Sequence, residues 1–273
     1  MVYDGIFEIF RDKETNESQP ASTGSSYRQE TSSSYNPSIT VADSRTFVLS
    51  VGGSTLMKEK INTAFIGKLS YALSQLRQQG YNFVIVVGGG KTAREYVAAG
   101  KALGATNNYA LDELGIQATR LNGLLLIQAL ENAVPQVLTD LHQAKGWLEK
   151  GKIPVYGGLI PGYTTDSIGA LLCEILNATF INLTNVDGVY SADPKENPEA
   201  KHYPEMSHNE LIKIIARSTG LGAIPSQNVI LDLPCALILK RSNIKTMILD
   251  AQELENLENA VQGLEFKGTL IED

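Results

Sequence analysis

Three short apolar segments, each followed by glycines, constrain the fold of this chain more than any other feature. They are residues 46–51 before Gly52-Gly53-Ser54, residues 83–87 before Gly88-Gly89-Gly90, and residues 153–156 before Gly157-Gly158. Each segment has the length of a buried strand, and residues with helical spacing lie between them. Strands that alternate with helices favour a largely parallel sheet covered on both faces. We therefore expect an α/β fold, built as a three-layer αβα sandwich.

Apolar periodicity predicts the other elements. Recurrence at three and four residues from Ile61 to Leu76 predicts a helix that Gly80 ends. Further helices are expected at about 90–103, 111–133, 166–176, 207–217, 226–240 and 252–262, and further strands at 179–183, 245–249 and 268–271. Residues 184–205 have the pattern of a hairpin, and the histidines at 142, 202 and 208 lie in polar segments where we expect them to be solvated.

The first 44 residues differ in composition from the rest. Residues 13–44 are rich in Ser, Thr, Asn, Gln and Glu and nearly free of aliphatic side chains. Such a segment cannot bury enough apolar surface to offset the entropy of ordering. We expect residues 1–44 to be a flexible, disordered polar extension and residues 45–273 to form the folded domain.

Composition narrows the class of protein. The chain has 273 residues, of which 43% are hydrophobic and 19% charged, as in a globular protein. A net charge of −7 gives no basic surface for nucleic acid. No apolar run approaches the roughly 20 residues that cross a bilayer, and the first residues lack a secretory pattern. With only Cys173 and Cys235, a disulfide framework is excluded. We expect a cytoplasmic enzyme that binds neither nucleic acid nor membrane.

The glycine turns predict a phosphate-rich ligand. In an open parallel sheet the ligand lies at the carboxyl ends of the strands, where such turns gather. Glycine lets the backbone approach an anion, and the following helix offers free N–H groups. A single glycine pair is more often an ordinary tight turn, but three at one sheet edge favour a site. The chain lacks both G-x-x-x-x-G-K-[ST] and G-x-G-x-x-G, which disfavours P-loop and ordinary dinucleotide-binding folds.

Five motifs recur in one known family of enzymes. They are SVGGS (50–54), VVGGGKTAREY (86–96), LDELGIQATRLN (111–122), GGLIPGYTTD (157–166) and TNVDGVYSADP (184–194). Together they resemble the amino acid kinase superfamily, and within it the archaeal-type uridylate kinases, over residues 46–272. The resemblance implies transfer of the γ-phosphoryl group of ATP to UMP in pyrimidine nucleotide synthesis. It also implies Mg²⁺ bound with ATP, and a homo-oligomer that is usually a hexamer.

The resemblance assigns one set of residues to ATP. The set is Gly53, Ser54, Gly90, Arg94, Thr184, Asn185, Tyr190 and Asp193, with Ser54 and Arg94 as the catalytic pair. The first turn could instead be a plain strand-to-helix connection, and Arg94 a solvated helix charge. Asp187 could hold a lysine or a metal, or build its turn. Lys91 lies beside the site, and no side chain is assigned as a resident metal ligand.

A second set is assigned to UMP: Gly89, Asp112, Leu159, Ile160, Pro161, Gly162, Tyr163, Thr164 and Thr165. Asp112 could instead be a helix N-cap, since Asp is a preferred capping residue. Likewise, Thr165 could cap the helix that follows it. Arg120, in the T-R-x-N pattern with Asn122, either helps to place the acceptor or braces a subunit contact.

The chain departs from the family at three positions. Ser50 stands where relatives in the wider superfamily often carry lysine, and residues 221–223 read L-G-A in place of K-A-G. Leu237 replaces a further lysine, with Lys240 one turn later. Fewer cations around a transferring phosphoryl group should slow the reaction. Two alternatives to UMP therefore stay open: another small acceptor (N-acetylglutamate, carbamate or isopentenyl phosphate), and a non-catalytic protein that binds a nucleotide or oxyanion.

Overall fold

The computed structural model describes residues 45–192, 194, 197, 199–218 and 230–273. Contacts divide the chain into residues 1–40 and residues 41–273, and the fold described below belongs to the second unit. The predicted polar extension, residues 1–44, lies outside the described residues, so its flexibility and the domain boundary stay predictions. No helix in the described ranges is long and apolar enough to cross a membrane.

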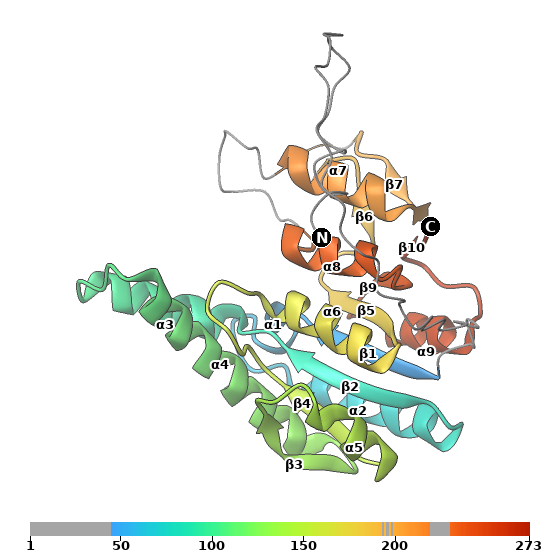
Figure 1. Cartoon of the computed structure of the whole chain (residues 1–273), viewed down its shortest axis with the longest axis horizontal. Coiled ribbons are helices and arrows are strands. Elements are labelled where there is room, and N and C mark those ends of the chain that lie inside the picture. The colour runs from blue at the N-terminus through green and yellow to red at the C-terminus, as the bar shows by residue number, and fades with distance from the viewer. Residues whose placement is uncertain (1–44, 193, 195–196, 198, 219–229) are drawn as a thin grey trace, which may run out of the picture. The chain divides into compact units, whose positions relative to one another are not determined.

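An eight-stranded sheet forms the centre of this unit, with the strand order β3-β4-β2-β1-β5-β9-β10-β8 (Figure 1). Neighbouring strands run parallel except β9 and β10, so the predicted largely parallel sheet is confirmed. The bounds are β1 Thr46–Val51, β2 Asn82–Val87, β3 Ala133–Leu138, β4 Ile153–Tyr156, β5 Thr179–Thr184, β8 Glu205–Met206, β9 Thr246–Asp250 and β10 Thr269–Ile271. The predicted hairpin region contains a separate antiparallel pair, β6 Val189–Tyr190 and β7 His202–Tyr203.

Helices cover both faces of the sheet, as Figure 1 shows. They are α1 Gly53–Leu56, α2 Thr63–Gln78, α3 Gly90–Ala102, α4 Asn108–Ala129, α5 Gln143–Glu149, α6 Thr165–Leu176, α7 His208–Ser218, α8 Leu233–Arg241 and α9 Leu254–Gln262. Alternate side chains of β1 lie on opposite faces of the sheet and so belong to two different hydrophobic cores. Phe47 and Leu49 pack with α2, α4 and α9 on one face, and Val48 packs with α5, α6, α7 and α8 on the other. The three-layer αβα sandwich is therefore confirmed.

Two predicted element boundaries are wrong. The helix expected at 111–133 ends at Ala129, and residues 133–138 form the edge strand β3. Asn132, with φ of 63°, turns the chain between them. The helix expected at 226–240 begins only at Leu233, because Asp232 accepts the Cys235 N–H at 2.6 Å and caps it. Residues 226–229 lie outside the described part of the chain.

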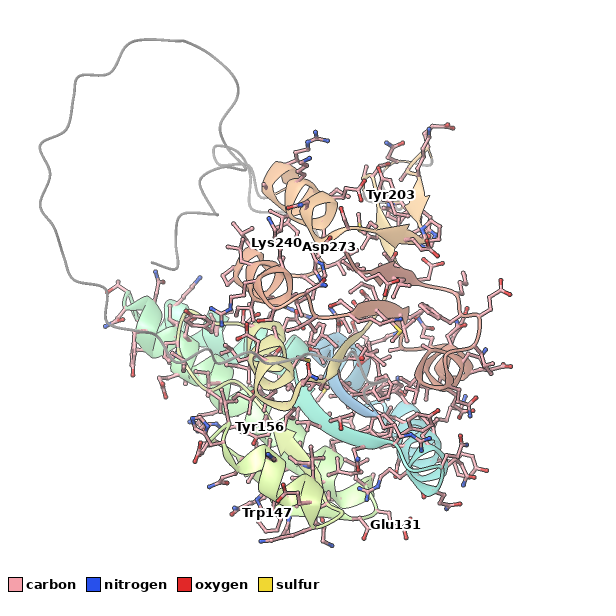
Figure 2. The ribbon with its side chains drawn as sticks, turned by 45° about the vertical axis from the view of Figure 1, so that its right-hand side comes forward. Glu131, Trp147, Tyr156, Tyr203, Lys240 and Asp273 are labelled. Atoms are coloured by element: carbon pink, nitrogen blue, oxygen red, sulfur yellow. The ribbon has the colours of Figure 1, made fainter. Side chains whose placement is uncertain are left out.

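Side-chain positions confirm part of the core. Tyr156 on β4 is fully buried, with its hydroxyl donating to the carbonyl of Asp140 at 3.0 Å (Figure 2). Trp147 on α5 packs against the same core (Figure 2) and carries the Lys150 ammonium 4.8 Å from its ring centroid. Cys173 on α6 is buried.

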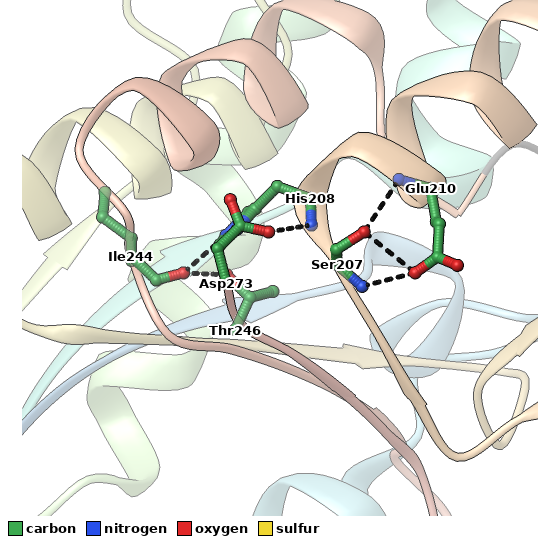
Figure 3. Close-up of polar contacts among 6 residues, drawn as sticks. All are labelled: Ser207, His208, Glu210, Ile244, Thr246 and Asp273. Atoms are coloured by element: carbon green, nitrogen blue, oxygen red, sulfur yellow. Dashed lines mark hydrogen bonds and ion pairs between the residues drawn. The ribbon is translucent and has the colours of Figure 1, made fainter.

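The expectation that all three histidines are solvated is wrong for His202, whose Nε2 is buried, and for His208. The side chain of His208 is 0% exposed, and its Nε2 lies 3.0 Å from the carbonyl oxygen of Ile244 (Figure 3). Asp273 accepts the backbone N–H of His208, and its second carboxylate oxygen lies 3.3 Å from Nδ1. Ser207 and Glu210 exchange hydrogen bonds at the same helix start, forming a capping box (Figure 3). Ile244 and Asp273 lie far from His208 in the sequence, so the composition of the segment around His208 could not reveal that its side chain is buried.

Candidate functional site

The strand ends converge at the sheet centre. The register sets Val51, the last residue of β1, beside Val87 of β2 and Leu183 of β5. Backbone hydrogen bonds extend this alignment into the turns. Gly52 donates to the carbonyl of Leu183 and Gly88 donates to that of Val51, each at 2.9 Å. The turns after these strands therefore share one edge, where an open parallel sheet binds its ligand.

The first two glycine turns are in direct backbone contact. A Cβ atom on Gly53 would lie 2.0 Å from the backbone nitrogen of Gly90. A Cβ on Gly90, whose φ is +57°, would lie 2.2 Å from the carbonyl oxygen of Gly53. Only glycine fits at both positions. Gly53 and Ser54, predicted to bind ATP, therefore lie beside Gly89 and Gly90.

The predicted acceptor loop, residues 159–165, is held by α4. Asp112 accepts the N–H of Gly162 at 2.8 Å, so the structure joins two features that were assigned separately to UMP. The alternative that Asp112 caps its helix is wrong: α4 begins at Asn108, and the side chain of Asn107 caps it. Within the loop Leu159 packs on the core, while Ile160 and Tyr163 are exposed.

The cap of α6 is Thr164 and not Thr165. The Thr164 hydroxyl accepts the N–H of Ser167 at 3.2 Å and donates to the Asp232 carboxylate. Ser167 also donates to Asp232, at 3.0 Å. Asp232 therefore ties the starts of α6 and α8 together, and the Thr164 hydroxyl already has protein partners.

Sequence reasoning missed the buried carboxyl group of Asp166. The Ser50 hydroxyl donates to it at 2.5 Å. Burial raises the pKa of Asp166 to about 6 against the opposing effect of the Ser50 hydrogen bond, and the Asp232 carboxylate raises it further. The unusual Ser50 was the available signal, although no spacing rule pairs it with a residue 116 positions later.

The other predicted ATP residues lie around the end of β5 and on β6. Thr184 ends β5, and Asn185 follows it on the surface. The Tyr190 hydroxyl donates to Asp187 at 2.8 Å, and Lys267 pairs with the same carboxylate at 2.9 Å. Burial acts to raise the pKa of Asp187, but these two hydrogen bonds, a backbone hydrogen bond and the charge of Lys267 together lower it. Of the three roles considered for Asp187, the structure shows the lysine partner. Asp193 lies outside the described residues.

The described basic residues of α3 and α4 differ in exposure and pairing. Arg94, on the second turn of α3, is exposed and lines a surface hollow of about 300 Å³ formed by α3 alone. Lys91 pairs with Glu59 at 3.3 Å and with Glu95 at 3.8 Å. Leu237 packs against the core. The Nε of Arg120 is buried without a hydrogen-bond partner among the described residues. The L-G-A segment at 221–223 lies outside the described part.

Two further residues of α4 contact the glycine turns. Thr119 accepts the N–H of Gly158 at 2.7 Å, and Asn122 donates to the carbonyl of Gly88 at 2.9 Å. Both residues belong to the T-R-x-N pattern of the sequence, which gives no sign that their side chains hold the glycine turns. Across the described ranges, no group of three or more His, Cys, Asp or Glu side chains could hold a metal ion.

Comparisons with known proteins agree with this geometry. A model of the amino acid kinase family matches residues 45–250. The uridylate kinase of Pyrococcus abyssi is 43% identical over 227 residues, covering 82% of this chain and 98% of that protein. The crystal structure of the uridylate kinase of Archaeoglobus fulgidus matches with a TM-score of 0.72 at 42% identity, over 82% of this chain and 99% of that one. The UMP kinase of Bacillus anthracis, at 22% identity and a TM-score of 0.71, shares the fold. The chain therefore belongs to the amino acid kinase family.

Proposed function

We propose that this protein is a UMP kinase, which transfers the γ-phosphoryl group of ATP to UMP and releases ADP and UDP. The curated relatives are consistently uridylate kinases, at about 40% identity over most of the chain. One structural observation supports the transfer itself: the turn at Gly53, assigned to ATP, touches through its backbone the turn that carries Gly89, assigned to UMP, and Gly90, assigned to ATP. Phosphoryl transfer depends chiefly on positioning donor and acceptor and on stabilising charge, with no covalent protein nucleophile.

The proposed roles follow the two sides of this contact. On the donor side, ATP is bound by Gly53, Ser54, Gly90, Arg94, Thr184, Asn185, Tyr190 and Asp193. On the acceptor side, UMP is bound by Gly89, by Asp112 and by the loop from Leu159 to Thr165. An oxygen of the UMP phosphate attacks the γ-phosphorus and ADP leaves. Ser54 and Arg94 stabilise the transferring group through hydrogen bonds aimed at its oxygens.

Mg²⁺ enters this scheme as part of the substrate. Magnesium in phosphoryl-transfer sites is held largely by nucleotide phosphates and water, with one or two carboxylates. The chemistry of the site fits such a complex: Asp166 and Asp232 lie near one another at the start of α6, and backbone N–H groups of the turns suit phosphate. The ion bound to ATP supplies charge neutralisation.

An acceptor panel tests the proposed function. ADP formation is followed in a coupled assay with Mg-ATP and each of UMP, CMP, AMP, N-acetylglutamate, carbamate and isopentenyl phosphate. UMP should give the highest kcat/KM. A higher kcat/KM for another acceptor would assign the protein a different activity within the amino acid kinase family. Binding of ATP and UMP with no ADP formed would indicate a nucleotide-binding protein that does not catalyse transfer. Ser50 and Leu237, uncharged where the family resemblance leads us to expect lysine, are compatible with that outcome.

We also propose that the protein works in the cytoplasm, where ATP and UMP are available, and assembles as a homo-oligomer, a hexamer by family resemblance. The exposed faces of α3 and α4, side by side in Figure 1, support assembly. α3 buries none of its residues in this chain. The two helices and their connection expose large apolar side chains at Tyr96, Leu103, Tyr109, Leu121 and Leu124. Light scattering after gel filtration measures the number of subunits, and a monomer at micromolar concentration would contradict the proposal.

A further inference from the structure

One turn of α4 contacts both acceptor-side turns of the sheet edge. The Thr119 hydroxyl accepts the N–H of Gly158 at 2.7 Å and donates to the carbonyl of Ile116 at 2.6 Å. Both hydrogen bonds are buried, and Thr119 is 7% exposed. Its lone pair and its proton are therefore both engaged, which fixes the rotamer and the position of Gly158.

The same turn reaches the second glycine turn. Asn122, 5% exposed, donates from one amide nitrogen to the carbonyls of Gly88 at 2.9 Å and Gly89 at 3.2 Å. The γ-methyl of Thr119 lies 3.4 Å from where a Cβ of Gly89 would stand. Thr119 therefore touches one turn with its methyl group and holds the other with its hydroxyl.

The glycines at these contacts are required by the close approach of α4. A Cβ on Gly157 would lie 2.4 Å from the Thr119 hydroxyl oxygen. A Cβ on Gly158 would lie 2.9 Å from the side chain of Ile116. Two turns further toward the start of α4, Asp112 holds Gly162. The loop that follows β4 is thus fixed to one rigid helix at both of its ends.

We propose that Thr119 and Asn122 are positioning residues for the acceptor nucleotide. They set the distance between the turn at Gly88-Gly89 and the loop from Gly158, without touching the substrate themselves. This inference rests on the proposed function, since it concerns how that acceptor is bound. Preorganised groups bind better because the substrate need not order them, and small displacements of reacting groups slow transfer strongly.

The main test removes the hydroxyl while keeping the side-chain shape. Thr119→Val leaves the Gly158 N–H without its partner, and we expect KM for UMP to rise about 10-fold, as for loss of one buried hydrogen bond. KM for ATP should change less than about twofold, because the hydrogen bond that this variant removes holds Gly158, next to the acceptor loop, and not the donor turn. Thr119→Ser, which keeps the hydroxyl, should return KM for UMP to within about threefold of wild type.

Ser70→Ala is the matched control. The Ser70 hydroxyl donates to the carbonyl of Ala129 at 2.5 Å, so this variant also removes a hydrogen bond to α4, but at its other end. Both KM values should stay unchanged. Hydrogen exchange over residues 157–165 supplies a second readout: the amides should exchange faster in Thr119→Val and as in wild type in Ser70→Ala. If Thr119→Val does not fold, Asn122→Ser replaces it and should raise KM for UMP while sparing that for ATP.

Several outcomes separate this inference from the proposed function. If both KM values rise equally, or if Thr119→Val behaves like Ser70→Ala, Thr119 is only a structural residue and the inference fails. If Thr119→Ser does not rescue KM, the hydroxyl is not the positioning group and the inference also fails. If the wild-type protein uses another acceptor in place of UMP, the proposed function fails. The inference is then tested separately, by whether Thr119→Val raises KM for that acceptor and leaves KM for ATP unchanged.

Discussion

At the level of single residues, the neutral Ser50 sets the surroundings of the Asp166 carboxyl, to which its hydroxyl donates a hydrogen bond. A lysine at this position would hold the neighbouring carboxyl in its charged form, whereas a neutral hydroxyl leaves burial to dominate. Burial accordingly raises the pKa of Asp166 to about 6, with the nearby Asp232 carboxylate acting in the same direction. Asp166 therefore takes up a proton at a higher pH than an ordinary carboxyl group does.

Asp166→Asn should change how stability depends on pH. The folded protein holds the Asp166 proton more tightly than the unfolded chain, with a pKa of about 6 against 3.8. The resulting stabilisation is complete below about pH 4 and is lost as pH rises through about 6. The shift corresponds to at most about 3 kcal/mol. Urea unfolding from pH 4 to 7 should show the variant gaining stability relative to wild type as pH rises. Parallel curves would contradict this.

Arg94→Ala should lower turnover through the ATP phosphates. The side chain is exposed on the second turn of α3, where a cation can reach a bound phosphate. Loss of one well-placed cationic donor corresponds to about 2–4 kcal/mol, or roughly 30- to 1000-fold in kcat/KM. Steady-state kinetics with varied ATP measures the effect. Activity within two- or threefold of wild type would make Arg94 a solvated surface charge.

Asp112→Ala should raise KM for UMP and leave that for ATP nearly unchanged. The carboxylate already accepts the Gly162 N–H with one oxygen, so the other is left to accept from a ribose hydroxyl. Such charge-assisted hydrogen bonds contribute about 1.5–3 kcal/mol. Asn107 caps α4, so the melting temperature should not fall as it would on loss of a cap. An unchanged KM for UMP would show that Asp112 does not bind the acceptor.

At the level of elements, hydrophobic periodicity predicted the helices and strands that depend on local sequence pattern. The central strands, the layers and the glycine turns follow from spacing alone, and the family and its activity followed from motifs in those turns. The edge strand β3 was missed because AVPQVL follows an apolar helix after only two polar residues, Glu131 and Asn132, the second with a positive φ. Thr164 as the cap of α6, Asn107 as that of α4 and the buried pair Ser50–Asp166 depend on tertiary contacts that no local pattern encodes.

The contact between the two glycine turns can be tested with a pair of alanine variants. Gly90→Ala places a Cβ 2.2 Å from a backbone oxygen at a φ of +57°, so it should destabilise the protein by more than about 2 kcal/mol and abolish transfer. Gly67→Ala, in the interior of α2 with no atom within 4 Å of the new Cβ, should stabilise it by about 0.5–1 kcal/mol. Unfolding curves measure both. Equal stability of the two variants would mean that the turns can move apart.

At the level of the whole molecule, residues 45–273 should be sufficient for folding and activity. The family match begins at residue 45, and the structure places β1, from Thr46, at the centre of the sheet. Arg45 belongs with the domain, since its carbonyl accepts the Asn82 N–H at 2.8 Å. Deletion of residues 1–44 should therefore leave the melting temperature and kcat/KM for UMP near those of the full chain, because that segment is too polar to contribute to a core. Deletion of residues 1–51 removes β1 and should abolish folding. Loss of folding in the shorter deletion would show that the polar segment is structural.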